Sequence, residues 1–292
     1  MRALESVRSQ SFSGPITCIV SENGQSRNTR EVFEAAASSS PEIRWKLLQS
    51  REVSPPPENW LRALKEADSR WVKILWDDDW MESTFLETTV KAAERNDVSV
   101  VTVGATTFST QGPQQVHYCG VPAITTREPG EILRLFAGLG VGLPVSPAAA
   151  LLDRHFAVLA LEASRKSGVC FERAMGPDLA LILEGALAGK GLTHVPDPLV
   201  NMWMGQDSIT VMSSKVDLRL CYDHAILMQA RRHGVAVPRD VRRRLQHRAF
   251  VAVVRRNPMR SNLISVRPQF SQLATNFRDH LWRPLVCFAR RR

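Results

Sequence analysis

The sequence predicts a layered α/β domain with a largely parallel sheet, followed by a basic, mainly helical region. Two observations carry this prediction. Through the first two hundred residues, short apolar runs rich in β-branched residues alternate with segments of helical periodicity, which is the order of an α/β sheet. Beyond residue 214 the pattern is helical only. We therefore expect an α/β domain over residues 1–214 and a basic helical region over residues 215–292.

Four apolar runs of the first half have the length and composition of buried strands. They cover residues 16–20, 43–48, 71–75 and 98–103. Helices are expected between them, over residues 29–38, 58–67 and 83–94. Residues 58–67 illustrate the signal, because Trp60, Leu61 and Leu64 share one helical face.

The second half begins with a less regular stretch, residues 105–150, that is rich in Gly, Pro and Thr. A helix is expected from Gly176 onward, since Pro177 suits a first helical turn. A pair of strands is expected at residues 193–195 and 199–204. Three further helices are expected, near residues 216–233, 238–256 and 268–289.

Composition excludes several classes of protein. No apolar run reaches the roughly 18–20 residues that span a bilayer, and the N-terminus has no apolar secretory segment. We therefore expect a cytoplasmic protein. The five cysteines are dispersed without a Cys-x-x-Cys pair, and no His-x-x-x-His pair is present, which argues against a disulfide framework and a structural zinc site.

Charge is unevenly distributed along the chain. The net charge is +9, yet residues 216–292 hold 17 Arg, no Lys and 4 Asp, so the remaining residues are slightly acidic. Amphipathic basic helices of this kind bind anionic membrane surfaces, or pack their apolar side on a neighbouring domain and leave the charges in water. Arginines also pair with nucleic-acid phosphates, but no recognised nucleic-acid-binding motif is present.

Three consecutive carboxylates, Asp77, Asp78 and Asp79, directly follow the apolar run at residues 71–75. Their mutual repulsion is costly unless solvent or a cation offsets it. Mg²⁺ or Mn²⁺ prefers oxygen ligands and takes one or two carboxylates together with substrate phosphates. The triplet is therefore a candidate metal site at a strand end, the alternative being a solvated acidic loop. A phosphate-binding P-loop is excluded, because the nearest match, residues 185–191, has the wrong spacing.

The order of these segments resembles the family 2 glycosyltransferases. The resemblance covers about residues 1–212 and begins at the helix after the strand with which that family usually starts. It rests on the Asn-bearing helix that contains Asn59, the strand that ends in the acidic triplet, and the acidic turn at Glu22 and Asn23. The short motif Gly176-Pro177-Asp178-Leu179 resembles the family segment that supplies a catalytic base.

The resemblance implies a GT-A fold, with a mixed, mostly parallel sheet flanked by helices, and an inverting transfer from a nucleotide-sugar donor. Asp178 would be the general base. Asp79 would be the principal ligand of Mg²⁺ or Mn²⁺, assisted by Asp77. The nucleotide-sugar would be bound by the residues at the ends of these strands and helices, namely Glu22, Asn23, Asn59, Asp77 and Asp78.

Family analogy further implies a glycan or lipid-linked acceptor, polysaccharide biosynthesis, and peripheral contact with an anionic membrane through the basic region. Three positions depart from the family pattern, because Gln25 and Arg27 follow Glu22 in the acidic turn and Gly205 stands where a histidine is usual. These departures leave two alternatives open: a catalytically impaired homologue that acts as a binding protein, and an arginine-rich nucleic-acid-binding protein.

Overall fold

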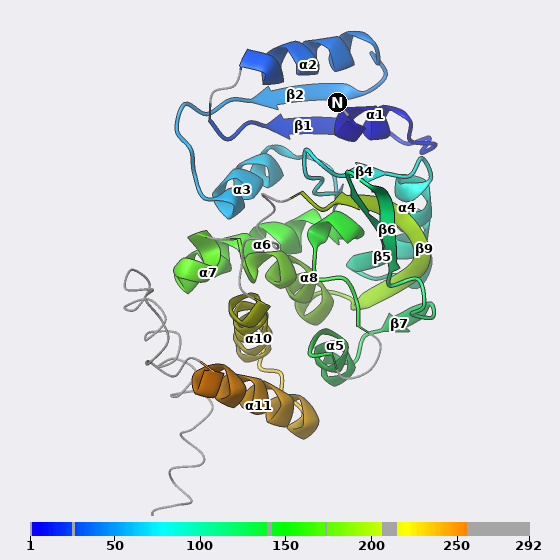
Figure 1. Cartoon of the computed structure of the whole chain (residues 1–292). Coiled ribbons are helices and arrows are strands. Elements are labelled where there is room, and N and C mark those ends of the chain that lie inside the picture. The colour runs from blue at the N-terminus through cyan, green and yellow to red at the C-terminus, as the bar shows by residue number, and fades with distance from the viewer. Residues whose placement is uncertain (1, 25–26, 139–141, 173, 206–214, 256–292) are drawn as a thin grey trace, which may run out of the picture.

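The computed structural model describes residues 2–24, 27–138, 142–172, 174–205 and 215–255. Within these ranges, helices cover a mixed β-structure (Figure 1). No helix among the described residues is long and apolar enough to cross a membrane.

The N-terminal part forms a small layer of two parallel strands with helices on its sides. β1 pairs with β2 in register from Thr17 opposite Arg44 to Ser21 opposite Leu48. Its elements are α1 (Arg2–Arg8), β1 (Thr17–Ser21), α2 (Arg27–Ser38), β2 (Arg44–Leu48) and α3 (Pro56–Glu66). Parallel strands require a crossover, and α2 supplies it.

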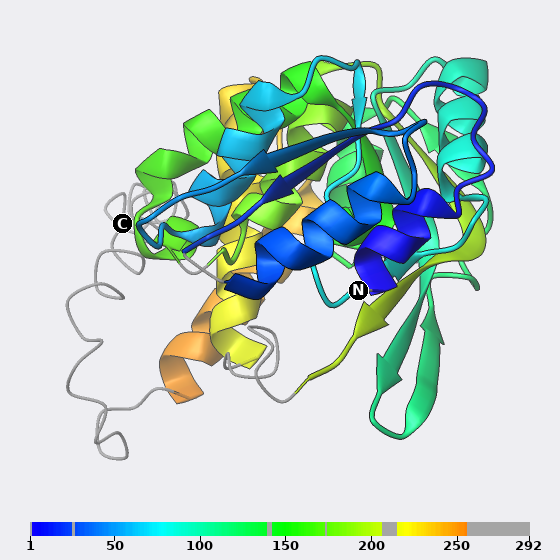
Figure 2. The ribbon, with the colours of Figure 1, turned by 90° about the horizontal axis from the view of Figure 1, so that it is seen from above.

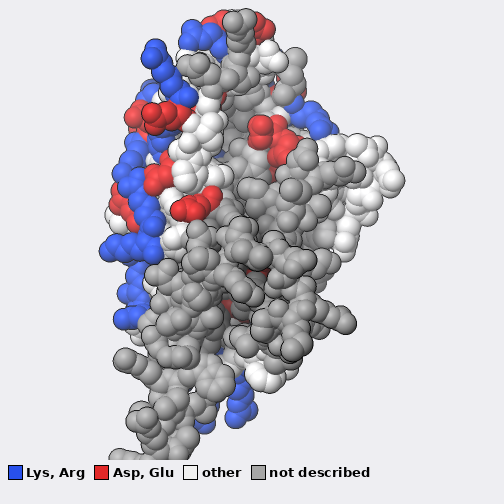
Figure 3. Space-filling model, turned by 60° about the vertical axis from the view of Figure 1, so that its left-hand side comes forward, with Lys and Arg blue, Asp and Glu red and all other residues white. Residues whose placement is uncertain are grey.

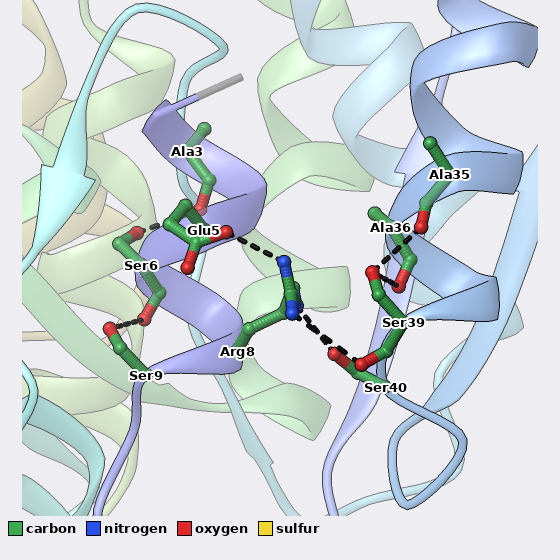
Figure 4. A network of polar contacts seen from close by, with 9 residues as sticks. All are labelled: Ala3, Glu5, Ser6, Arg8, Ser9, Ala35, Ala36, Ser39 and Ser40. Carbon is green, nitrogen blue, oxygen red and sulfur yellow. Dashed lines mark hydrogen bonds and ion pairs between the residues drawn. The ribbon is translucent and has the colours of Figure 1, made fainter.

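The helices α1 and α2 lie side by side (Figure 2), and Arg8 links α1 to the end of α2 (Figure 4). Its Nε donates to the Ser40 hydroxyl at 2.5 Å, and its Nη1 donates to the Glu5 carboxylate at 2.8 Å. Ser40 is buried, so this arginine contact fixes where the chain leaves α2 and enters β2.

The central sheet has seven strands in the order β3-β8-β5-β9-β4, with β6 paired to β5 and β7 to β9. Val100, Val101 and Val103 of β5 have no exposed surface, which places this strand in the middle of the core. The strands are β3 (Trp71–Val72), β4 (Trp80–Met81), β5 (Val100–Ser109), β6 (Gly112–His117), β7 (Ile124–Thr126), β8 (Ala150–Asp153) and β9 (Leu192–Trp203).

The register between β5 and β9 shifts at Gly104. A Cβ at this position would lie 2.5 Å from the Cys119 Sγ and 2.6 Å from the Pro196 carbonyl oxygen. Only glycine allows the two strands to approach this closely at the irregularity.

α8 (Pro177–Ala188) is the central helix. It is apolar on all sides and nearly every residue is buried, as expected for a helix with neighbours all round it. The helices and helical turns before it are α4 (Phe85–Asn96), α5 (Pro129–Phe136), η1 (Pro147–Ala149), α6 (Arg154–Ser164), η2 (Arg165–Ser167) and α7 (Val169–Glu172). α6, α5 and α10 all contact α8.

Two C-terminal helices complete the core. They are α10 (Lys215–Arg232) and α11 (Arg239–Arg255), which lie beneath α8 in Figure 1. Ile226, Ala230 and Leu245 have no exposed surface and belong to the same hydrophobic cluster as α8. Glu184 of α8 reinforces the packing, because Arg232 Nε donates to its carboxylate at 3.2 Å.

The structure confirms the α/β fold class and corrects two details. The sheet is mixed, but among the described strands only β1–β2 and β5–β9 are parallel, so it is less parallel than the sequence predicts. The two strands predicted at residues 193–195 and 199–204 form one continuous strand, β9. The helix predicted near residues 268–289 lies outside the described residues, and the proposed boundary at residue 214 stays a prediction.

On the face in Figure 3, lysine and arginine side chains alternate with aspartate and glutamate side chains along one edge. Elsewhere in the fold, neighbouring helices are joined by ion pairs, for example Lys65 of α3 with Glu162 of α6 and Arg165 with Glu58 of α3. These pairs are exposed, so each contributes little to stability.

Candidate active site

The acidic triplet forms the loop between β3 and β4. Asp77 and Asp78 are exposed, whereas Asp79 is only 3% exposed. The Asp79 Oδ1 accepts a hydrogen bond from the backbone N–H of Trp203 at 2.9 Å. That bond ties the loop to the end of β9, so the triplet has one fixed carboxylate and two that face solvent.

Two carboxyl groups of this loop, those of Asp78 and Asp79, have raised pKa values. Burial and the neighbouring Asp77 charge raise the pKa of Asp78. Burial also raises the pKa of Asp79, and the bond from Trp203 opposes that shift. A cation bound at the loop would relieve the repulsion among the three carboxylates.

Lys73 lies beside the loop and is a residue that sequence reasoning missed. Its ammonium donates to the carbonyl oxygens of Ile74, at 2.9 Å, and Ala148. Burial lowers the pKa of Lys73, and the charge of Asp79 opposes that effect. In the sequence, Lys73 looks like a solvent-facing residue of a short apolar strand. Only the structure shows that its ammonium is buried and bonds to backbone carbonyl oxygens next to the acidic loop.

Arg2 of α1 also lies near the loop. Its guanidinium stands 4.4 Å from the ring centroid of Trp80 and 4.8 Å from that of Trp203. Cation–π contacts of this kind hold an arginine in place. The positive charge of Arg2 lowers the pKa of Asp78 and so opposes part of the increase that burial and Asp77 cause.

Three of the predicted nucleotide-binding residues, Glu22, Asn23 and Asn59, lie near the end of β1, whereas Asp77 and Asp78 belong to the acidic loop. Glu22 is 7% exposed, and its carboxylate accepts from Gln49 Nε2 at 3.1 Å. Asn23 and Ser54 exchange hydrogen bonds, with the Ser54 N–H donating to Asn23 Oδ1 at 2.8 Å. These contacts fix the backbone of the acidic turn against the loop before α3.

Asn59 joins α3 to β1. Its Nδ2 donates to the Ser21 carbonyl oxygen at 3.0 Å, and its Oδ1 accepts from the Ser21 hydroxyl at 2.8 Å and from Arg62 Nη2 at 2.7 Å. Arg62 Nη2 also donates to the Glu22 carbonyl oxygen at 2.5 Å. Arg62 therefore connects Asn59 with the acidic turn, a role that its helical surface pattern did not reveal.

Asp178 lies at the start of α8, where the helix dipole favours a negative charge. The backbone N–H groups of Gly176 and Leu179 donate to its Oδ1 at 2.8 and 2.9 Å. The hydroxyl of Tyr222 on α10 donates to its Oδ2 at 2.9 Å. Burial raises the pKa of Asp178 to about 6, although all three hydrogen bonds act to lower it.

Tyr222 retains its proton near neutral pH, because burial and the Asp178 charge raise the pKa of its hydroxyl. It can therefore only donate to the carboxylate. Tyr222 lies within an ordinary apolar helix pattern, and nothing in the sequence relates it to a residue on another helix.

The predicted site residues thus form three groups. The first is the β1 end with Glu22, Asn23 and Asn59, the second is the acidic triplet, and the third is Asp178 with Tyr222. Within the described ranges, no contact joins Asp178 directly to the triplet.

The residues present are compatible with a divalent cation. Among the described residues, no cluster of three or more His, Cys, Asp or Glu side chains forms a complete metal cage. Mg²⁺ does not need such a cage, because it usually binds one or two carboxylates and the phosphates of a substrate. Asp79, whose Oδ1 accepts a hydrogen bond from Trp203, and the exposed Asp77 could supply these two carboxylates.

The mixed sheet flanked by helices has the GT-A-type fold of nucleotide-sugar-dependent glycosyltransferases. The chain belongs to glycosyl transferase family 2, whose family model matches residues 1–155. Among curated proteins, none matches the chain.

Solved structures of S. aureus TarS share the fold. The structure of TarS residues 1–349 in complex with UDP-GlcNAc has a TM-score of 0.63 and 13% sequence identity, with 96% of this chain and 76% of that chain covered. The complex of the same TarS fragment with UDP has a TM-score of 0.58 and 14% identity, with 99% and 82% covered. At these identities the likeness establishes the fold alone.

Proposed function

We propose that the protein is an inverting glycosyltransferase that moves a sugar from a nucleotide-diphosphate donor to a hydroxyl of a glycan or lipid-linked acceptor. Membership of family 2 supports the class of reaction. The observation that carries the mechanism is the environment of Asp178, a partly buried carboxylate with a pKa of about 6 and three fixed hydrogen-bond donors.

Asp178 has the properties of a general base. A base is most effective when its pKa lies close to the working pH, because it is then ionised and still attracts a proton. The two backbone amides hold one carboxylate oxygen, and Tyr222 holds the other. In the proposed reaction, Asp178 takes the proton of the acceptor hydroxyl while that oxygen attacks the anomeric carbon and the nucleoside diphosphate leaves.

The acidic loop is proposed to hold Mg²⁺ or Mn²⁺ through Asp79 and Asp77. When bound, such an ion supplies positive charge to the leaving diphosphate. The chain's own contribution is positional, since the bond from Trp203 fixes Asp79 and the cation–π contacts fix Arg2 beside Asp78.

The donor is proposed to bind between the β1 end and the acidic loop. TarS was crystallised with UDP-GlcNAc and with UDP, which supports a UDP-type donor for a chain of the same fold. Glu22, Asn23 and Asn59 would form the nucleoside side, with Asp77 and Asp78 near the ribose and phosphates. Because the side chains of Asn23 and Asn59 bond to Ser54, Ser21 and Arg62, we propose that these two asparagines shape the pocket through the backbone.

The basic C-terminal region, residues 215–292, is proposed to bring the enzyme to an anionic membrane, while its helices α10 and α11 complete the core formed with residues 1–214. Its 17 arginines over residues 216–292, unaccompanied by lysine, support this assignment. The acceptor would then be met at that surface, as suits a lipid-linked glycan.

Calorimetry with UDP-, GDP- and dTDP-sugars, each with and without Mn²⁺, tests the proposal. We expect one nucleotide to bind, with binding strengthened by the metal and with slow release of free sugar on incubation. Asp178→Asn should bind the same donor equally well and lose turnover. Donor binding without turnover in the native chain would identify a catalytically impaired binding protein, and salt-dependent binding of DNA or RNA alone would identify a nucleic-acid-binding protein.

A further inference from the structure

Three arginines from two helices converge on one point beside the end of α5. Their Nη2 atoms lie 3.3 Å (Arg219), 3.5 Å (Arg248) and 3.6 Å (Arg244) from the position that a Cβ would occupy on Gly138. Any two of these atoms are therefore within about 7 Å of each other, which is less than a Debye length at physiological salt. The three positive charges repel one another at this distance.

The described residues supply little negative charge to the cluster. Asp223 is the carboxylate that contacts it, with its Oδ1 accepting from Arg248 Nη1 at 2.8 Å. Burial raises the pKa of Asp223 to about 6. Partial burial of the Arg219 guanidinium, together with the charges of Arg248 and Arg244, lowers the pKa of Arg219. The cluster thus keeps an excess of positive charge that Asp223 does not balance.

Helix capping accounts for only one of the three arginines. The Arg248 Nη2 donates to the Ala137 carbonyl oxygen at the end of α5, at 2.5 Å, where a cation is favourable. Among the described residues, Arg219 and Arg244 donate no hydrogen bond, and both are exposed. The sequence that continues from Gly138 to Pro144 contains no carboxylate.

The three guanidinium groups surround the backbone of Gly138, which has no side chain to separate them. Its φ of +69° lies in the left-handed region that favours glycine, and a Cβ would meet Arg219 at 3.3 Å. A side chain at this position would occupy the point toward which all three Nη2 atoms converge.

We propose that Arg219, Arg244 and Arg248 form a binding site for a phosphate group, separate from the proposed donor site. Guanidinium groups match the geometry of phosphate oxygens and bind them through paired N–H···O bonds. A bound phosphate offsets the mutual repulsion of the three arginines. The site takes a phosphomonoester or phosphodiester, whether on a soluble ligand or on a lipid headgroup.

One arginine of the proposed site lies on the same helix as the residue that holds the proposed base. Arg219 is one helical turn before Tyr222 on α10, and side chains three residues apart lie on neighbouring positions of a helix surface. A phosphate held by Arg219 would therefore anchor its ligand close to the helix that orients Asp178. The phosphate site itself does not depend on glycosyl transfer.

Titration of the full chain with inorganic phosphate and with glycerol 3-phosphate, at constant low ionic strength, tests the proposal. We expect saturable binding that Arg219→Gln and Arg244→Gln each weaken by about tenfold, since each removes one charged pair of donors. Arg248 is left intact because its pairing with the buried Asp223 supports the fold.

Arg243→Gln is the matched control. It removes the same charge from the next position of α11, is exposed, and lies outside the cluster. If all three variants weaken phosphate binding equally, the effect comes from net charge and the proposed site is wrong. The proposal is also wrong if Arg219→Gln and Arg244→Gln bind phosphate with wild-type affinity. Asp79→Asn should bind phosphate normally, which separates this site from the donor site.

Vesicle sedimentation distinguishes the two sources of the phosphate. Phosphatidylglycerol vesicles that bind the native chain and Arg243→Gln, but not Arg219→Gln, would assign a lipid headgroup, with phosphatidylcholine vesicles as the uncharged control. Binding of glycerol 3-phosphate without vesicle binding would assign a soluble ligand. Absence of both, with no saturation by inorganic phosphate, would refute the proposal.

Discussion

The hydroxyl of Tyr222 donates a hydrogen bond to Oδ2 of Asp178 at 2.9 Å, and this bond joins α10 to the first turn of α8. Asp178 is the proposed base, and its other oxygen is held by two backbone amides. Both residues lie beyond the 1–155 segment that matches the family model. The proposed base and the helix that orients it therefore both lie outside the matched segment.

Tyr222→Phe should move the pH dependence of catalysis. Asp178 must be ionised to act, so kcat/KM should rise with pH through about 6 and then level off. The bond from Tyr222 lowers the pKa of Asp178, and its loss should move the midpoint upward by about one unit. The plateau at high pH serves as the internal control, and an unmoved midpoint would show that Tyr222 does not hold the base.

Asp79→Asn should weaken Mn²⁺ binding, measured by titration in the presence of the nucleotide, by at least about tenfold. The asparagine keeps an oxygen that can accept from Trp203, so the fold should be preserved. Glu82→Gln is the control, because Glu82 lies just after the loop and pairs with Asn201 instead. If Asp79→Asn and the native chain bind Mn²⁺ with equal affinity, Asp79 is not a ligand of the metal.

Gly104→Ala should destabilise the fold by about 2 kcal/mol or more, since its methyl group has no room between β5 and the loop that contains Cys119. Denaturant unfolding measures the change in free energy. Gly120→Ala provides the comparison, because a Cβ at that position meets nothing within 4 Å. If the two variants are equally stable, β5 and β9 can move apart at Gly104 without a measurable loss of stability, and the close approach is not required.

A chain that ends at residue 214 should unfold without a cooperative transition and bind hydrophobic dyes. Removing α10 and α11 uncovers the part of the core to which Ile226, Ala230 and Leu245 contribute. A chain that ends at residue 255 should melt cooperatively, as followed by circular dichroism. Cooperative melting of the shorter chain would make residues 1–214 a folding unit of their own.

Much of the fold can be predicted because its early strands and helices have strong local patterns. β1, β2 and the start of β5 lie in the predicted apolar runs, and α3 follows the predicted apolar face. The predicted strand at residues 71–75 was too long, because pairing stops after Val72 and the backbone turns toward the acidic loop. β6 was not predicted, since its side chains are mostly exposed and carry no alternating pattern.

α6 was also missed, although the sequence contains a signal for it. The carboxylate of Asp153 accepts from the backbone N–H of His155 at 3.0 Å and caps the helix, a pattern visible as an Asp before an apolar run. The site was only partly predictable. Asp178 and Asp79 follow from motifs, whereas Tyr222 and Arg62 act on residues distant in the sequence, and only tertiary packing brings such pairs together.

The docking of α10 also sets an order of events during synthesis. Ribosomes make the chain from its N-terminus, so the acidic loop and Asp178 are complete before residue 222 exists. Until α10 has emerged and packed on α8, the carboxylate lacks its phenolic partner. A nascent or prematurely terminated chain that lacks α10 would therefore carry Asp178 without the hydrogen bond that orients its carboxylate.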